Sequence, residues 1–111
     1  MVHELKLHPE PFELIRSGNK IIESRLWDEK RQQIEVGDTL MFKRRPDFIE
    51  VVKGEVVELL RYGSFEELFG AYPVELFGQE SRQKLMIAIR KYYSPEKEQQ
   101  YGVVGIKFRL I

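Results

Sequence analysis

Three ionisable side chains, Lys20, Glu23 and Arg25, lie close together in the segment Gly18 to Arg25, GNKIIESR. A carboxylate between two cations keeps a low pKa, and cations held beside it can meet an anionic ligand or take part in proton transfer. For each charge taken alone, a solvated strand face or a plain ion pair is the simpler interpretation. Three of them within six residues, beside a glycine turn, favour a binding or acid–base site.

The same segment has the character of a strand that leaves a tight turn. Ser-Gly-Asn precedes Lys20, and two β-branched isoleucines follow it. Because strand side chains alternate between faces, Glu23 and Arg25 are expected on the same face. Lys20 falls on the other face, but at the mouth of the strand it can still lean toward Glu23.

The pattern G-x-K-x-x-E-x-R in this segment resembles the signature of ASCH domains, a group within the PUA-like superfamily. The stretches HPEPFELIRSG (His8 to Gly18) and IEVGDTLMF (Ile34 to Phe42), and a final hydrophobic strand, are also similar to segments of such domains. The resemblance covers nearly the whole chain. It implies a small PUA-like β-barrel with flanking helices, and RNA binding in a cleft lined by the signature residues.

Some small bacterial members of this family hydrolyse the acyl group of N4-acetylcytidine. They use a Lys and a Thr of the signature strand and a Glu that precedes the long helix. Lys20 corresponds to the Lys, but Glu23 stands where the hydrolases carry Thr, so the hydroxyl is missing. Glu80 is the nearest candidate for the second carboxylate, and Glu75 competes with it. The resemblance therefore places the catalytic set Lys20, Glu23 and Glu80 second to a binding site.

Length and composition narrow the possible classes of protein. A chain of 111 residues is expected to form one domain, residues 1–111. It has no cysteine, and His3 and His8 alone cannot close a metal site, so no metal and no cofactor are predicted. The first residues do not resemble a signal peptide and no apolar run could span a bilayer, which together favour the cytoplasm.

Eighteen basic and eighteen acidic residues give a formal net charge of zero. Any attraction to nucleic acid must therefore come from a local patch. Lys43, Arg44 and Arg45 form the densest basic cluster, which suits phosphate contact but equally suits a solvated loop. Trp27 is interpreted either as a core anchor or as a platform for base stacking. His8 is interpreted as a cap or packing residue at the start of a helix.

The order of the expected elements is α+β, and a long strand with a bend at Gly54 favours a small barrel. A helix over 81–93 is expected to bury Leu85, Ile89 and Tyr92, whereas residues 96–100 are expected to form a charged loop. The expected elements are strands over 3–7, 20–25, 39–42, 49–62 and 103–111 and helices over 11–16, 64–70 and 81–93.

Three functions are compatible with these features. The first is a module that binds RNA or a nucleotide-like ligand through Lys20, Glu23, Arg25, Trp27 and the basic cluster. The second is an amidohydrolase acting on a modified nucleoside. The third is a protein-interaction barrel in which the charged trio is only structural. An open cleft around the trio would favour the first two functions, and a buried, fully paired trio would favour the third.

Overall fold

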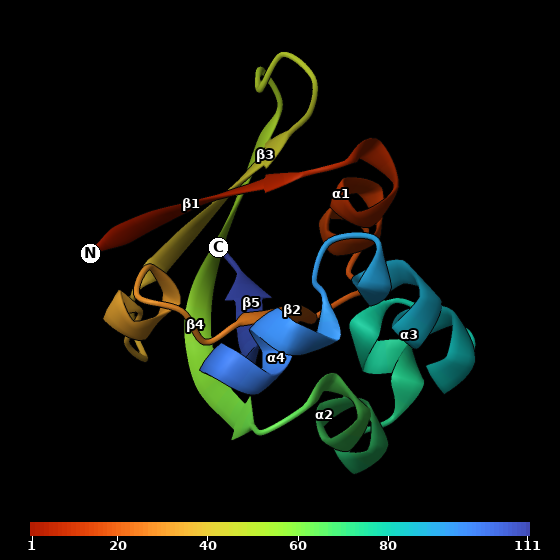
Figure 1. Cartoon of the computed structure of the whole chain (residues 1–111). Helices are drawn as coiled ribbons and strands as arrows, with labels where there is room; N and C mark the ends of the chain where they lie inside the picture. Colours follow the sequence, from red (N-terminus) through yellow and green to blue (C-terminus); the bar gives the residue numbers. More distant parts are fainter.

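The fold is built on one strongly curved five-stranded sheet with helices on its flanks (Figure 1). The computed structural model describes residues 1–111. The strand order is β1-β3-β4-β5-β2, so β1 and β2 are the two edges and the sheet is a half-barrel. Strand β1 pairs with β3 in parallel, and the other neighbours are antiparallel. The predicted α+β, PUA-like, barrel-shaped architecture is confirmed.

The strands carry the alternation that the sequence indicates. Leu40 and Phe42 point into the core and are fully buried, as predicted for the strand that follows the Gly-Asp turn. The strands are β1 (Val2–Leu7), β2 (Ile22–Leu26), β3 (Thr39–Arg44), β4 (Val51–Tyr62) and β5 (Val103–Leu110).

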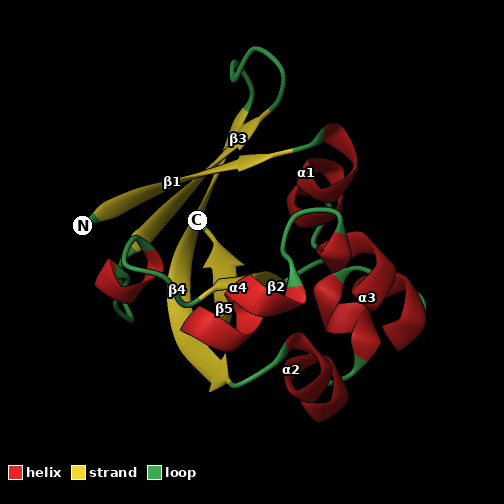
Figure 2. Ribbon diagram, viewed as in Figure 1, coloured by secondary structure: helices red, strands yellow, loops and turns green.

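Four α-helices flank the half-barrel, and in Figure 2 α1, α2 and α3 lie on the same side of the sheet. Ser64 and Ser81 are N-caps, because each hydroxyl accepts a hydrogen bond from the amide three residues later. None of the helices combines the length and the apolar character that crossing a bilayer requires. The helices are α1 (Pro9–Arg16), α2 (Phe65–Ala71), α3 (Arg82–Arg90) and α4 (Pro95–Tyr101).

The segment expected to be a charged loop is helix α4. Ser94 caps this helix and Pro95 occupies its first turn. This pair is a helix-start signal, but the many charged residues that follow it led to the prediction of a loop. Its Glu98 is buried and accepts hydrogen bonds from the Phe65 amide and from Arg90 Nη2, both at 2.7 Å. This carboxylate therefore ties α4 to the start of α2 and to the end of α3.

Two further expectations are corrected by the structure. Helix α3 ends at Arg90, so Tyr92 lies beyond it and is 58% exposed instead of buried in the stripe. The irregularity of β4 falls between Val56 and Glu58, not at Gly54. A Cβ at Gly54 would lie 3.1 Å from the Phe108 ring, so close packing, and not a bulge, accounts for this glycine.

Two clusters of buried apolar side chains hold the elements together. One fills the half-barrel and includes Phe12 and Ile15 of α1. The other lies where α2 and α3 pack against β2 and the end of β4, and it contains Leu85 among the rings of Phe69 and Phe77. The predicted packing of α3 through Leu85 is confirmed, because only 7% of that residue is exposed.

Replacing Leu85 with Ala is expected to lower the free energy of unfolding by about 2–5 kcal/mol, because it leaves a cavity beside two phenylalanines. Ile87→Ala is the matched control in the same helix, since Ile87 is 58% exposed. Urea denaturation followed by circular dichroism measures both variants. Equal losses would contradict this description of the helix faces.

Candidate functional site

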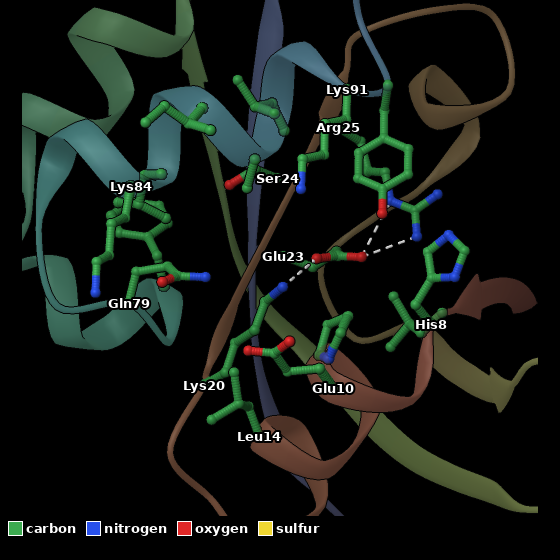
Figure 3. A pocket seen from close by; sticks show the side chains of 18 of the residues that line it. His8, Glu10, Leu14, Lys20, Glu23, Ser24, Arg25, Gln79, Lys84 and Lys91 are labelled. Atoms are coloured by element: carbon green, nitrogen blue, oxygen red, sulfur yellow. Dashed lines mark hydrogen bonds and ion pairs between the residues drawn. The ribbon is translucent and has the colours of Figure 1, made fainter.

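Glu23 is a buried carboxylate held between two cations (Figure 3). Its Oε1 lies 2.8 Å from Lys20 Nζ, and its Oε2 accepts from Arg25 Nε at 3.1 Å and from Arg25 Nη2 at 2.8 Å. Only 4% of Glu23 is exposed. The trio predicted from the sequence is therefore brought together, with Lys20 leaning toward Glu23 as expected.

The loop before β2 fixes the position of Lys20. Helix α1 ends at Arg16, and the chain turns at Gly18, whose φ of 83° only glycine adopts easily. The Lys20 amide then donates to the Leu14 carbonyl at 3.0 Å. On the other side of the loop, a Cβ at Gly78 would lie 3.0 Å from Lys20 Cβ, and Gly78 itself has a φ of 82°. A larger residue at position 78 would therefore push Lys20 out of place.

Arg25 joins the two edges of the half-barrel. Besides its bonds to Glu23, its Nη2 donates to the Lys6 carbonyl on β1 at 3.3 Å. Burial alone would lower the pKa of Arg25, but the adjacent Glu23 carboxylate, with a smaller contribution from Tyr93, raises it. Arg25 therefore stays charged where β1 and β2 face each other.

Burial and the neighbouring charges shift the pKa of Glu23 in opposite directions. Desolvation by burial would raise its pKa, but the charges of Lys20 and Arg25 and their hydrogen bonds outweigh that effect and hold the pKa at about 2. At neutral pH the carboxylate is ionised. Because one negative charge faces two positive ones, the trio carries an excess positive charge.

The trio lines a cleft of about 480 Å³ between the end of β1, α1, β2 and α3. Figure 3 shows the cleft with Glu23 at its centre and Lys84 and His8 toward opposite sides. The apolar part of its wall comes mainly from α1, α2 and α3 and includes Leu14, Phe69, Phe77, Leu85, Ile87 and Ile89.

The charge of this cleft differs from that of the whole chain. Two carboxylates, Glu10 and Glu23, line it together with six cations, whereas the chain as a whole has equal numbers of each sign. Three of these cations, Lys6, Arg45 and Lys91, form no ion pair with a carboxylate of the chain. The six cations are Lys6, Lys20, Arg25, Arg45, Lys84 and Lys91.

The structure divides the predicted basic cluster. Arg45 lines the cleft, but Lys43 pairs with Glu4 at 2.7 Å and Arg44 pairs with Glu50 at 3.4 Å, and neither lines the cleft. Alternation along β3 and the turn after it sends consecutive side chains in different directions. A run of basic letters in the sequence is thus not a single basic surface.

Trp27 lies outside this cleft. It is half-buried against the core of the half-barrel, and the guanidinium of Arg61 lies 4.6 Å from the centre of its ring. Trp27 and Arg61 border a separate cavity of about 470 Å³ with Tyr62 and Tyr101. Both interpretations of Trp27 thus keep a structural basis, the anchor in its packing and the platform in this second cavity.

Glu80 and Glu75, the two candidates for the second carboxylate of a hydrolase, also lie outside the cleft. Glu80 is exposed and pairs with Lys84 at 2.7 Å, and this hydrogen bond lowers its pKa. Glu75 is exposed as well. His8 occupies the N-cap position of α1 without a side-chain capping bond, and it borders the cleft instead. No group of three or more acidic or histidine side chains is placed to hold a metal ion.

Sequence reasoning missed several residues that line the cleft. Lys84, Ala88 and Lys91 recur at helical spacing, so one face of α3 could have been recognised as a basic face toward the site. Lys6 and Tyr92 carry no such signal, because only the packing of distant segments brings them to the cleft.

The chain belongs to the ASCH domain family, whose sequence model matches residues 5–111. The crystal structure of hypothetical protein PH0355 is 36% identical and superposes with a TM-score of 0.88, covering 100% of both chains. The solution structure of a Pyrococcus furiosus protein is 35% identical, with a TM-score of 0.79 over 100% of this chain and 98% of that one.

More distant proteins share the fold or part of the sequence. The crystal structure of an ASCH protein from Zymomonas mobilis is 19% identical and has a TM-score of 0.64, covering 96% of this chain and 65% of that one, which supports the fold alone. An uncharacterized protein of Aquifex aeolicus (strain VF5) is 33% identical over 67 residues. That match spans 60% of this chain and only 30% of the Aquifex protein.

The ion-pair trio predicts a specific pH dependence of stability. The pKa of Glu23 falls from 4.5 to about 2 on folding, so its contribution is fully present above pH 4.5 and is lost as the pH falls toward 2. Glu23→Gln is expected to lower the free energy of unfolding by about 3 kcal/mol at pH 6, with the difference shrinking below pH 4.5. Denaturant titrations at several pH values measure this difference.

The exposed Glu75, which has no ion-pair partner, provides the control for this experiment. Glu75→Gln should leave the free energy of unfolding unchanged at pH 6. A difference between wild type and Glu23→Gln that stays constant from pH 6 to pH 3 would contradict the assigned role of the carboxylate.

Proposed function

We propose that the chain binds single nucleotide units of RNA, or a nucleotide-like ligand, in the cleft around Lys20, Glu23 and Arg25. The observation that carries the proposal is the surplus of cations in this cleft of a protein with no net charge. Phosphate binding by proteins depends on such local concentrations of Lys and Arg. Membership of the ASCH family supports the same conclusion, since its domains commonly bind RNA.

The two kinds of lining suit the two parts of a nucleotide. Lys6, Arg45 and Lys91 have no carboxylate partner and are available to phosphate oxygens. The apolar wall around Leu14 and Ile89 suits the faces of a base or a ribose. Because Glu23 is ionised and accepts hydrogen bonds only, it holds Lys20 and Arg25 in place and can accept from an exocyclic amine.

Hydrolysis of an acylated nucleoside is the second candidate. Lys20 supports it, because an ammonium held at the cleft by a carboxylate could stabilise a developing oxyanion. The position of Glu80 outside the cleft leaves Glu23 and Glu10 as the carboxylates near the reacting group. The binding proposal ranks first because it requires no further proton-transfer group.

Arg45 and Lys43 offer a charge-matched pair of variants. The affinity for a fluorescently labelled single-stranded RNA is measured by anisotropy over a range of salt concentrations. Arg45→Gln should reduce the slope of log affinity against log salt concentration by about 0.7, because one phosphate contact is lost. Lys43→Gln removes the same charge away from the cleft and should leave the slope unchanged. Equal effects of the two variants, or binding independent of salt, would contradict the proposed cleft.

The second candidate is separated from the first by incubating the protein with N4-acetylcytidine and following cytidine release by chromatography. The binding proposal predicts no turnover by the wild type. Deacylation at enzymatic rates that Lys20→Ala abolishes would replace it with the hydrolase. A gain of activity in Glu23→Thr alone would show that the rest of the cleft is arranged for that chemistry.

A further inference from the structure

Two rings meet at the cleft without belonging to either hydrophobic core. His8 lies just before α1 and Tyr92 just after α3, and their ring centres are 5.7 Å apart with 29° between the planes. Both side chains border the cleft, His8 appearing at one side of it in Figure 3. Burial of apolar surface does not explain this pair, because both residues are exposed.

The pair can open at low cost. His8 makes no capping hydrogen bond to α1, and the Tyr92 hydroxyl forms no hydrogen bond within the chain. A flat base held between two rings requires their centres to be about 7 Å apart, twice the roughly 3.4 Å rise of stacked bases. The ring centres are 5.7 Å apart, so the two rings must separate before a base can enter, and the exposed side chains have the rotamer freedom to do so.

Two cations without a carboxylate partner, Lys91 and Arg45, line the cleft together with the two rings. Lys91 is next to Tyr92 in the chain, and the Arg45 amide donates to the Leu7 carbonyl at 2.8 Å, which puts Arg45 beside His8. A base between the rings would therefore have a basic side chain near each of its neighbouring phosphates. One nucleotide could thus stack its base between the rings and place its phosphates near the basic side chains.

We propose that His8 and Tyr92 form a clamp that receives one unpaired base, which makes the ligand of the cleft a single-stranded nucleic acid. This inference rests on the proposed function and names its substrate class. In a duplex both faces of each base are covered by its neighbours, so the rings have no face to contact. Stacking between rings also tolerates any base, because every base has a π-face.

The test compares oligouridylate with an abasic oligonucleotide of the same length and phosphate number, using the full chain. Tyr92→Ala is expected to weaken oligouridylate binding by roughly 5- to 150-fold, the loss typical of one stacked base, and to leave the abasic affinity unchanged. Tyr92→Phe keeps the ring and should retain the affinity. Lys91→Gln should weaken binding of both oligonucleotides, because it removes a phosphate contact.

The outcomes separate the clamp from the proposed function. Wild-type binding that is equal for the two oligonucleotides, or a Tyr92→Ala variant that loses affinity for both or for neither, would overturn the clamp and leave phosphate binding in place. Binding of duplex RNA as tight as that of the single strand would also overturn it. If the wild type binds neither oligonucleotide, the proposed function and the clamp both fail. Because Tyr92 is exposed, the alanine variant should unfold at the same urea concentration as the wild type.

Discussion

The site depends on the burial of one carboxylate between two cations. An ionised carboxyl group taken out of water is costly unless it is paired, and Glu23 meets that condition with Lys20 on one side and Arg25 on the other. The pairing links the loop after α1 to β2, and Arg25 extends the link to the end of β1. The same interaction thus joins the open edges of the half-barrel and holds two cations at the cleft.

The interpretation of the trio as purely structural and its interpretation as a ligand site are compatible. The trio is buried and paired, as a structural network requires, yet all three residues line a cleft of about 480 Å³. A rigid, fully paired trio is preorganised, so a ligand that contacts it does not have to restrain long flexible side chains. The cations without a carboxylate partner, Lys6, Arg45 and Lys91, line the same cleft, where they can contact phosphates.

Local patterns in the sequence predicted those parts of the fold and site that depend on near neighbours. Strand alternation and the glycine turn sufficed for Lys20, Glu23 and Arg25, and the helices expected over 64–70 and 81–93 begin within one residue of the starts of α2 and α3. The prediction was wrong about where helix α3 ends, because the helix stops three residues earlier than expected and Tyr92 therefore lies at the cleft and not in the core. The direction of Lys43, Arg44 and Arg45 depends on the turn after β3, and the approach of Lys6 to α3 depends on tertiary packing, so neither could be predicted.

The central claim is that the cleft around Glu23, and no other surface, receives the nucleic acid. The most direct test is to titrate ¹⁵N-labelled protein with a single-stranded oligonucleotide and to map the changes in backbone amide chemical shift. The account predicts the largest changes at Ser24, Arg25 and Tyr92, with small changes at Lys43 and Trp27. Changes concentrated at Lys43 or around Trp27 and Arg61, with none along β2, would contradict it.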